Sequence, residues 1–274
     1  MALPWTDEEL DGERTRCDAL LAGLDIAYET QLPLREGRCG AAIPLKITSI
    51  GRNPAVSIGG TALLNCEMAA MLAVWIRDEL QPAAISLLGS PVARLTSVSS
   101  YVCRNRYGSR DQPVSEHAFA NAFDIASFET AVGQKITVLD HWTIAPPDIP
   151  LPLRKPTLVE RGLLPSAEAA IKSPTPAEAA PSGTLVTPAV AGTREALQPA
   201  PAPEAPSGVA PRPVLPEAPP PSPEPPDPRT LFLRHAHKTA CRMFGTVLGP
   251  EANAAHKDHF HLDLAERRHG NYCQ

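Results

Sequence analysis

Apolar residues recur at helical spacing in three segments of the chain. These segments are residues 6 to about 23, residues 62–80 and residues 228 to about 245. The first begins with Thr6 and Glu9, which have the spacing of a capping box. The second should end at Gln81-Pro82, because proline lacks the amide N–H that a helix needs. The third should begin near Pro228 and end at Gly245, since proline is tolerated in a first turn and glycine is common after a last one.

Shorter runs of β-type residues, separated by turn residues, lie between and after these helices. They are residues 93–102, 122–128, 135–139 and 259–264. Helices together with short separate strands predict an α+β domain. We expect a small, mainly antiparallel sheet, flanked by the helices, to carry the functional site.

Proline divides the chain into three parts. Of its 32 prolines, 24 fall between Pro146 and Pro228, in a stretch rich in Ala, Glu, Ser and Thr that has no aromatic residue. Such a composition cannot bury enough apolar surface to offset chain entropy, so residues 146–228 should be a disordered or polyproline-like insert. Residues 1–145 and 229–274 should be the two parts of one domain, because the cost of closing a loop rises only slowly with its length.

Charge and cysteine content narrow the class of protein. The formal net charge is −5 and the sequence has no basic stripe, which argues against a nucleic-acid partner. All six cysteines lie outside the insert, and an even number suits disulfides and an oxidising compartment. Six buried free thiols are the alternative. Sequence alone cannot choose among about 15 pairings, although Cys241 and Cys273 bracket the last predicted strand and we expect a bond between them.

The N-terminal residues conflict with the cysteines. They show no basic segment followed by an apolar one, so no signal peptide is visible. No apolar run approaches the length of a membrane span. The cysteines nevertheless favour a periplasmic or otherwise exported protein over a cytosolic one.

The last predicted strand carries the strongest chemical signal. Its polar and apolar residues alternate, so His259, His261 and Asp263 should share one face of the strand while the leucines face the core. With His256 just upstream, three histidines fall within six residues, and neutral imidazole is a good ligand for zinc. A solvated basic turn is the alternative interpretation.

A second polar pair lies far upstream of this strand. His117 stands on a predicted loop, and Asp124 follows seven residues later on the strand that the loop enters. Taken alone, this spacing is a weak signal. With a C-terminal histidine the pair would supply three protein ligands and leave a fourth position for water, which is the open coordination of a catalytic zinc site.

Several motifs taken together resemble a known family. They are Ser115-Glu116-His117, Asn121-Ala122-x-Asp124-Ile125, Cys241-Arg242-x-Phe244-Gly245-Thr246-Val247-Leu248-Gly249-Pro250 and Asn253-Ala254-Ala255-His256. In this combination they resemble the bacterial extensin-like C-terminal domain family, over nearly all of the chain outside the insert. The pattern Ser-x-His-x6-Asp, followed far downstream by His-x-His, is also similar to cell-wall zinc peptidases, which include D-Ala-D-Ala carboxypeptidases, lysostaphin-type enzymes and murein endopeptidases.

The resemblance implies roles for individual residues. The zinc ligands fall on His117, Asp124 and His261. His259 falls on a non-ligand active-site histidine, His256 on a histidine that lines the cleft, and Asp258 stands where relatives with a carboxylate base have glutamate. Because aspartate is one methylene shorter, we assign the acid–base role to His259 first and to Asp258 second. Position 120 departs from the family pattern, with Ala where Gly is usual.

The expected activity follows from this resemblance. It implies a zinc-dependent hydrolase that cleaves peptide bonds in the stem peptides or cross-links of peptidoglycan. Arg104 and Arg106 precede the metal loop and could pair with a substrate carboxylate, although solvated surface arginines are the alternative. The rival hypotheses are a non-catalytic wall-binding module that keeps the fold, and a zinc-free structural protein anchored through the insert.

Overall fold

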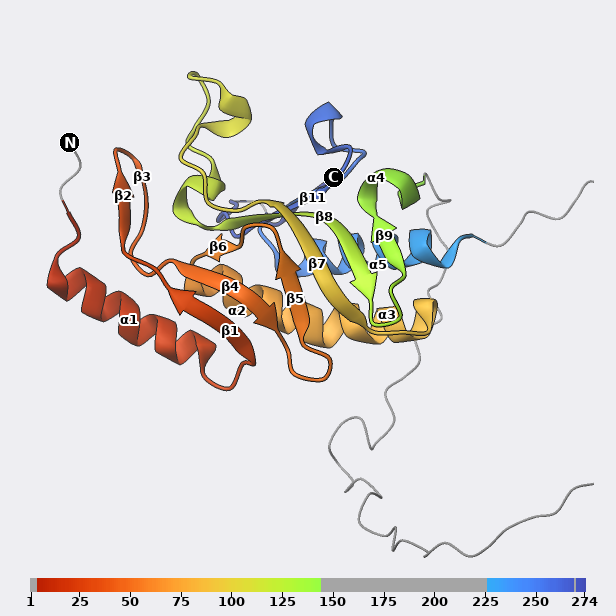
Figure 1. The fold of residues 1–274 in the computed structure, drawn as a ribbon. Coiled ribbons are helices and arrows are strands. Elements are labelled where there is room, and N and C mark those ends of the chain that lie inside the picture. The colour runs from red at the N-terminus through yellow and green to blue at the C-terminus, as the bar shows by residue number, and fades with distance from the viewer. Residues whose placement is uncertain (1–3, 144–225, 269) are drawn as a thin grey trace, which may run out of the picture. The chain divides into compact units, whose positions relative to one another are not determined.

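A ten-stranded sheet forms the centre of the computed structural model, which describes residues 4–143, 226–268 and 270–274 (Figure 1). In spatial order its strands are β1 (Ile26–Thr30), β4 (Leu45–Ile50), β5 (Val56–Gly59), β7 (Val92–Ser99), β8 (Ala122–Thr130), β11 (Phe260–Asp263), β10 (Thr246–Leu248) and β12 (Tyr272–Cys273), with β6 (Leu63–Leu64) beside β4 and β9 (Lys135–Thr137) beside β8. A separate ribbon joins β2 (Leu34–Glu36) to β3 (Cys39–Ala41).

Neighbouring strands of the large sheet are antiparallel except for β5 with β7 and β10 with β12. The α+β class and the mainly antiparallel sheet are therefore confirmed. The sheet is larger than expected, because the sequence analysis predicts no strand where β1, β4, β5, β6, β10 and β12 lie. Strand β4 alternates buried and exposed residues over its first four positions, a signal that the sequence analysis did not use.

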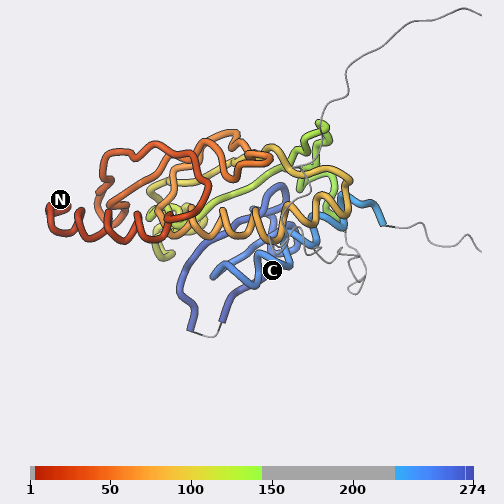
Figure 2. Tube along the Cα trace, turned by 90° about the horizontal axis from the view of Figure 1, so that it is seen from below, coloured from red at the N-terminus to blue at the C-terminus, as the bar shows by residue number. Residues whose placement is uncertain are grey.

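Helices α2, α3 and α5 run along one face of the sheet (Figures 1 and 2). The α-helices are α1 (Asp7–Leu21), α2 (Cys66–Trp75), α3 (Gln81–Leu88), α4 (Val138–His141) and α5 (Pro228–Met243). A π-helical turn, η1 (Ile76–Leu80), joins α2 to α3, and the 3-10 turns are η2 (Arg106–Gly108), η3 (Glu116–Phe119) and η4 (Ala254–His256). The predicted capping box of Thr6 and Glu9 is present at the start of α1.

The helix predicted at residues 62–80 has different ends in the structure. It starts later, because β6 pairs with β4 and Asn65 then caps α2 with its side chain. It also continues beyond Pro82 through α3, so the prediction that Gln81-Pro82 closes it is wrong. The π-turn is the reason. It shifts the hydrogen bonds by one residue just before the proline, with Gln81 N–H bonded to the carbonyl of Ile76, so the missing N–H falls where the helix changes register.

Glycine at position 245 serves a different purpose from the one predicted. Helix α5 ends two residues earlier, and Gly245 does not adopt the left-handed conformation typical of a residue after a helix. Its amide donates to the carbonyl of Asp263 (2.8 Å), and a Cβ atom here would overlap the carbonyl oxygen of Ala265. The position therefore needs glycine because two backbone segments approach closely.

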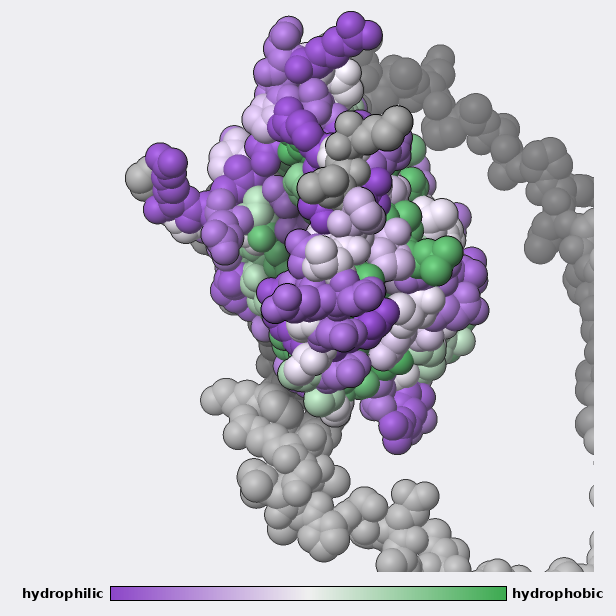
Figure 3. All heavy atoms as spheres, turned by 90° about the vertical axis from the view of Figure 1, so that its left-hand side faces the viewer, coloured by the Kyte–Doolittle hydropathy of each residue, from purple (hydrophilic) through white to green (hydrophobic). Residues whose placement is uncertain are grey.

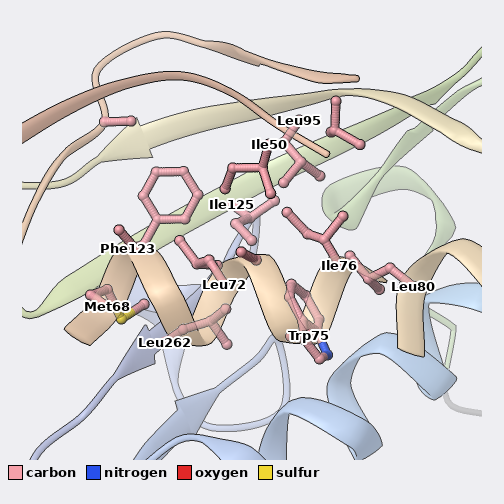
Figure 4. Close-up of a cluster of buried hydrophobic side chains, with 14 of the residues drawn as sticks. Ile50, Met68, Leu72, Trp75, Ile76, Leu80, Leu95, Phe123, Ile125 and Leu262 are labelled. Atoms are coloured by element: carbon pink, nitrogen blue, oxygen red, sulfur yellow. The ribbon is translucent and has the colours of Figure 1, made fainter. Parts of the chain in front are cut away.

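Alternation in β8 and β11 separates the hydrophobic core from the polar face of the sheet. Phe123 and Ile125 of β8 and Leu262 of β11 point toward α2, where they meet Leu72 and Trp75 (Figure 4). None of these five side chains is more than 1 % exposed. Full burial of a side chain of this size contributes about 1.5–3 kcal/mol. Because successive side chains of a strand point to opposite faces, the polar residues between them face away from the helices.

All six cysteines are paired. The disulfides are Cys17–Cys66, Cys39–Cys103 and Cys241–Cys273. The expected bond between Cys241 and Cys273 is confirmed, and the alternative of six free thiols is wrong. Three disulfides are typical of a protein that matures in an oxidising compartment.

Residues on the two sides of the predicted insert build one unit. Residues 144–225, nearly all of that insert, lie outside the described residues. The hydroxyl of Thr230 in α5 donates to the carbonyl of His141 in α4 (2.8 Å) and lies 3.4 Å from the hydroxyl of Thr143. Strand β8, before the insert, pairs with β11, after it.

The surface carries few extended apolar features on the face shown in Figure 3. Within the described residues, no helix is both long enough and apolar enough to cross a membrane. The face shown in Figure 3 carries mostly hydrophilic residues, with hydrophobic ones in scattered patches. Scattering of this kind is ordinary for a folded protein.

Candidate metal centre

Three ionisable side chains from three elements meet on the face of the sheet opposite the helices. Asp124 of β8 and His261 of β11 are directly opposite in the antiparallel register, and His117 comes from η3. Nδ1 of His261 lies 2.8 Å from Oδ1 of Asp124. Nε2 of His117 lies 3.2 Å from Oδ2 of Asp124 and 3.2 Å from Nδ1 of His261. All three residues are buried. We call them the His–Asp–His cluster.

A left-handed residue places His117 over the sheet. Ala120 has φ of 53°, and its amide donates to the carbonyl of His117 (3.2 Å), which closes η3 just before β8. The amide of Asn65 donates to the carbonyl of Ala120 (2.8 Å) and holds the turn against the start of α2. A left-handed backbone costs about 1–2 kcal/mol for a residue with a Cβ atom. Glycine, which has no Cβ atom, would avoid this cost at position 120.

Each imidazole of the cluster has a further acceptor behind it. Nδ1 of His117 lies 2.5 Å from the carbonyl oxygen of Ser100, and Nε2 of His261 lies 3.1 Å from Oδ2 of Asp263. An N–H at each of these positions leaves a lone pair on the opposite nitrogen, and those two nitrogens face each other within the cluster. Outer partners of this kind are typical of metal-binding histidines.

Burial and charge act in opposite directions on the pKa values of Asp124 and His261. Burial alone would raise the pKa of Asp124, but hydrogen bonds from His117 and His261 hold it well below its ordinary value. Burial would lower the pKa of His261, yet the carboxylates of Asp124 and Asp263 raise it to about 9. A proton on His261 therefore balances the buried carboxylates, and a divalent cation bound at the same point would replace that proton.

The donor set fits zinc. Two imidazole nitrogens and one carboxylate are ligands that catalytic zinc sites use. Donors bound tetrahedrally at about 2.0–2.2 Å from the ion lie roughly 3.3–3.6 Å apart. In the cluster, one potential donor atom from each of the three residues lies within 4.8 Å of the other two, so the three side chains are close enough to share one ion.

A second group of potential ligands lies elsewhere in the described residues. It consists of His237, Cys241 and Cys273. Its two sulfurs are bonded to each other in a disulfide and are not thiolates, so this group does not offer a metal site in the oxidised protein.

A cavity of about 390 Å³ opens beside the His–Asp–His cluster. Its wall is formed by the segment after β7, by β8, β10 and β11, and by the segment that leads to β12. Of the other predicted site residues, four line the cavity: Arg104, Arg106, His256 and His259. Asp258 is not part of the lining, and its side chain is 65 % exposed.

The two ring nitrogens of His259 have different neighbours: one faces the cluster and the other faces Asp258. Its Nε2 lies 3.9 Å from Oδ2 of Asp124, and its Nδ1 lies 2.8 Å from Oδ1 of Asp258. The Asp258 carboxylate can therefore orient His259, although it does not reach the cluster itself. The ring of His256 is centred 5.3 Å from that of His259. Burial, with the positive charges of its histidine neighbours, lowers the pKa of His256 to about 4, so this ring is neutral at pH 7.

Sequence reasoning missed four charged or aromatic residues of the cavity: Tyr107, Glu116, Arg267 and Tyr272. The carboxylate of Glu116 accepts from Nδ2 of Asn121 (2.8 Å), and its place beside His117 in the motif was a usable signal. Arg267 and Tyr272 follow the last predicted strand in a segment without periodicity. They reach the cavity only because β12 returns beside β10, and no local pattern indicates that return.

Fold and site together define an α+β domain with a candidate metal centre of two histidines and one aspartate. The family model described as extensin-like protein C-terminus matches residues 15–151 and 223–274, which is more than two thirds of the chain. The chain therefore belongs to the extensin-like C-terminal family. The unmatched residues between the two segments fall within the predicted insert. None of the curated proteins and none of the solved structures matches the chain.

Proposed function

We propose that this protein is a zinc-dependent hydrolase that cleaves peptide bonds in the stem peptides or cross-links of peptidoglycan. The observation that best supports this proposal is the His–Asp–His cluster beside the cavity, since it offers three protein donors with room for water and substrate. Zinc held by His117, Asp124 and His261 would supply the Lewis acidity that makes water a good nucleophile near neutral pH. The motifs that resemble cell-wall zinc peptidases suggest the substrate class.

In this proposal His259 carries the proton during hydrolysis. Asp258 accepts a hydrogen bond from Nδ1 of His259 (2.8 Å), which fixes the ring and leaves the lone pair on Nε2. Nε2 faces the cluster and can take a proton from the attacking water, then give it to the departing amine. Asp258 then acts through His259, as a positioning residue. The neutral ring of His256 completes the wall of the cavity beside it.

Of the two arginines proposed to bind substrate, Arg104 has fewer ionic contacts within the protein. Arg106 lies 3.9 Å from the carboxylate of Glu116. Arg104 forms no ion pair with any described residue and is exposed at the cavity rim. Its guanidinium can therefore bind a substrate carboxylate without first giving up a partner.

The disulfides support an exported, periplasmic location. Bonds between distant cysteines form and persist in oxidising compartments, where peptidoglycan is also found. Peptidoglycan is accordingly the partner that we propose.

One observation favours a second candidate, a non-catalytic wall-binding module that keeps the fold. The related peptidases with a carboxylate base have glutamate where this chain has Asp258, and here that carboxylate is exposed and bonded to His259. If His259 does not replace the base, the site would bind wall peptides without cleaving them.

Zinc analysis and digestion of purified sacculi test the proposal. Purified full-length protein should contain one zinc ion per chain and should release soluble muropeptides. His261→Ala should abolish tight zinc binding, because it removes a ligand. His259→Ala should still bind zinc but should no longer release muropeptides. Equal loss of zinc in both variants would contradict the division of roles, and zinc-loaded wild type that sediments with intact sacculi would favour the binding module.

A further inference from the structure

Arg267 presents an unpaired guanidinium group to the cavity. Its Nε donates to the hydroxyl of Thr246 (3.0 Å), and Nη2 donates to the same oxygen. No carboxylate of a described residue forms an ion pair with it, whereas Arg229, for example, is paired with Asp227. An arginine has five N–H donors, so most of those on Arg267 are left for a ligand.

The side chain of Arg267 is held in place on its own side of the cavity. Thr246, on β10, accepts from Arg267 and also hydrogen bonds to Asp263. The guanidinium carbon lies 6.0 Å from the centre of the Tyr272 ring, on β12. Arg267 is half-buried between these contacts. A guanidinium that is fixed before binding loses less entropy when a ligand arrives.

Sheet order places this arginine across the cluster from Arg104. The strands run β7, β8, β11, β10, and the cluster residues Asp124 and His261 lie on the middle two. Arg104 belongs to the segment that follows β7, whereas Arg267 rests on β10. In Figure 1 the yellow segment after β7 rises above the sheet on the side away from α2. Three strand spacings separate β7 from β10, roughly 14 Å.

The cavity therefore has a free cation on each side of the candidate metal centre. Its own carboxylates are engaged: Asp124 belongs to the cluster, Asp263 supports His261, and Glu116 holds Asn121. A neutral substrate would leave both guanidinium groups without an anionic partner among the described residues. A substrate with two carboxylates would pair with both, and a planar carboxylate matches the fork of an arginine in two parallel hydrogen bonds.

We propose that Arg267 binds a carboxylate of the substrate, so that the substrate is a peptide with a free carboxylate on each side of the bond over the cluster. This inference rests on the proposed function and names its substrate class. Arg267 is a specificity residue in this assignment, and Thr246 is the residue that positions it.

Peptide binding to zinc-loaded full-length protein tests the proposal. The ligands are a synthetic stem tetrapeptide and versions in which one carboxylate at a time is a carboxamide. Calorimetric titration uses protein with His259→Ala, so that bound peptide is not consumed. Amidation of one particular carboxylate should weaken binding about tenfold or more, the effect of a lost charge-assisted hydrogen bond. Adding Arg267→Gln should weaken binding of the unamidated peptide to the same extent. In that variant, amidation of the same carboxylate should have almost no further effect on affinity.

Two further variants separate recognition from structure. Arg268→Gln makes the same charge change on the exposed neighbouring residue, which does not line the cavity, and should bind all peptides as the parent does. Thr246→Val keeps the guanidinium group and removes the hydroxyl that accepts its hydrogen bond. This variant should therefore weaken binding of the unamidated peptide less than Arg267→Gln does. The inference is overturned if no peptide binds, or if every amidation has the same effect with and without Arg267.

Failure of this inference can be told apart from failure of the proposed function. If wild-type protein releases muropeptides while Arg267→Gln binds every peptide normally, the hydrolase proposal stands. The role of Arg267 in binding a carboxylate is then rejected. Selective loss of carboxylate recognition in Arg267→Gln, without any release by wild type, would keep the subsite and make the protein a binding module.

Discussion

His261 has a carboxylate on each side of its ring, and the two act differently. Asp124 faces Nδ1 (2.8 Å) as a member of the cluster, whereas Asp263 faces Nε2 (3.1 Å) from behind. Asp263 also accepts the amide of Ala265 (3.0 Å), so its orientation is fixed by the backbone. A carboxylate behind a ligating imidazole sets its tautomer and raises the basicity of the nitrogen that faces the metal.

Asp263→Asn should weaken zinc binding by about 10–100-fold, although all three ligands remain, because the amide supports the ring of His261 less well. Competition with a chromophoric chelator measures this affinity. Asp258→Asn is the matched control, since it removes a carboxylate from His259 instead. That variant should keep the zinc affinity and slow muropeptide release. Wild-type affinity in Asp263→Asn would show that Asp263 does not support the metal ligand.

At the scale of elements, hydrogen bonds link the first turn of helix α2 to the segment beside the candidate metal centre. Oδ1 of Asn65 accepts the amide of Met68 (2.8 Å) and caps the helix. Nδ2 of the same residue donates to Oδ1 of Asn121 (3.0 Å), directly before β8. Asn121 in turn donates to Glu116 (2.8 Å), next to the cluster. One side chain thus joins a core helix to the segment that positions His117.

Asn65→Ala should lower the free energy of unfolding by about 1–2 kcal/mol, because it removes the helix cap and one partner of Asn121. Asn65→Ser should cost less, since serine can cap α2 but is too short to reach Asn121. Urea unfolding of the two variants and the wild type measures the difference. An unchanged midpoint for Asn65→Ala would contradict both contributions.

Strand β12 is the element that completes the cavity beside β10. It pairs with β10 in parallel, and the bond from Cys273 to Cys241 ties it to α5. Tyr272, which lines the cavity, lies on this strand. The disulfide therefore links the stability of the fold to the shape of the site.

Replacing Cys241 and Cys273 together by serine should lower the free energy of unfolding by about 3–4 kcal/mol, since the bond closes a loop between cysteines 32 residues apart. Unfolding by guanidinium chloride without reductant measures the loss. In parallel, thiol titration of denatured wild-type protein from its native host should find no free thiol. Six reactive thiols there would place the protein in a reducing compartment and undercut the cell-wall proposal.

At the scale of the whole molecule, the described residues stop at Thr143, after α4, and resume at Pro226, before α5. These two points are close, because Thr230 hydrogen bonds to the carbonyl of His141. Asp227 caps α5 from just outside it, with Oδ1 2.9 Å from the amide of Arg229. The domain therefore supplies its own contacts at the junction.

Replacing residues 150–226 by a short Gly/Ser linker should leave the free energy of unfolding within about 1 kcal/mol, because the cost of loop closure varies slowly with length. The replacement keeps Asp227 and so keeps the cap of α5. Thermal and urea unfolding of the shortened protein measure the change. Collapse of the fold would mean that the insert packs on the domain and that its predicted disorder is wrong.

Local rules predicted the parts of the fold that local contacts determine. The capping box of Thr6 and Glu9 depends on residues three positions apart, and the polar face of β11 depends on a period of two. Continuation of the helix past Pro82 was not predictable in this way, because the π-turn before it leaves no mark in the apolar pattern.

The sequence by itself determined the chemistry: His117, Asp124 and His261 as candidate ligands, and an even set of cysteines. Only the tertiary structure decided which distant residues come into contact. Asp124 and His261, 137 residues apart, face each other because β8 pairs with β11, and Arg267 reaches the cavity because β12 returns beside β10. Such contacts form when the burial of a shared core offsets the entropy of closing long loops. That balance belongs to the folded chain as a whole, and no segment encodes it.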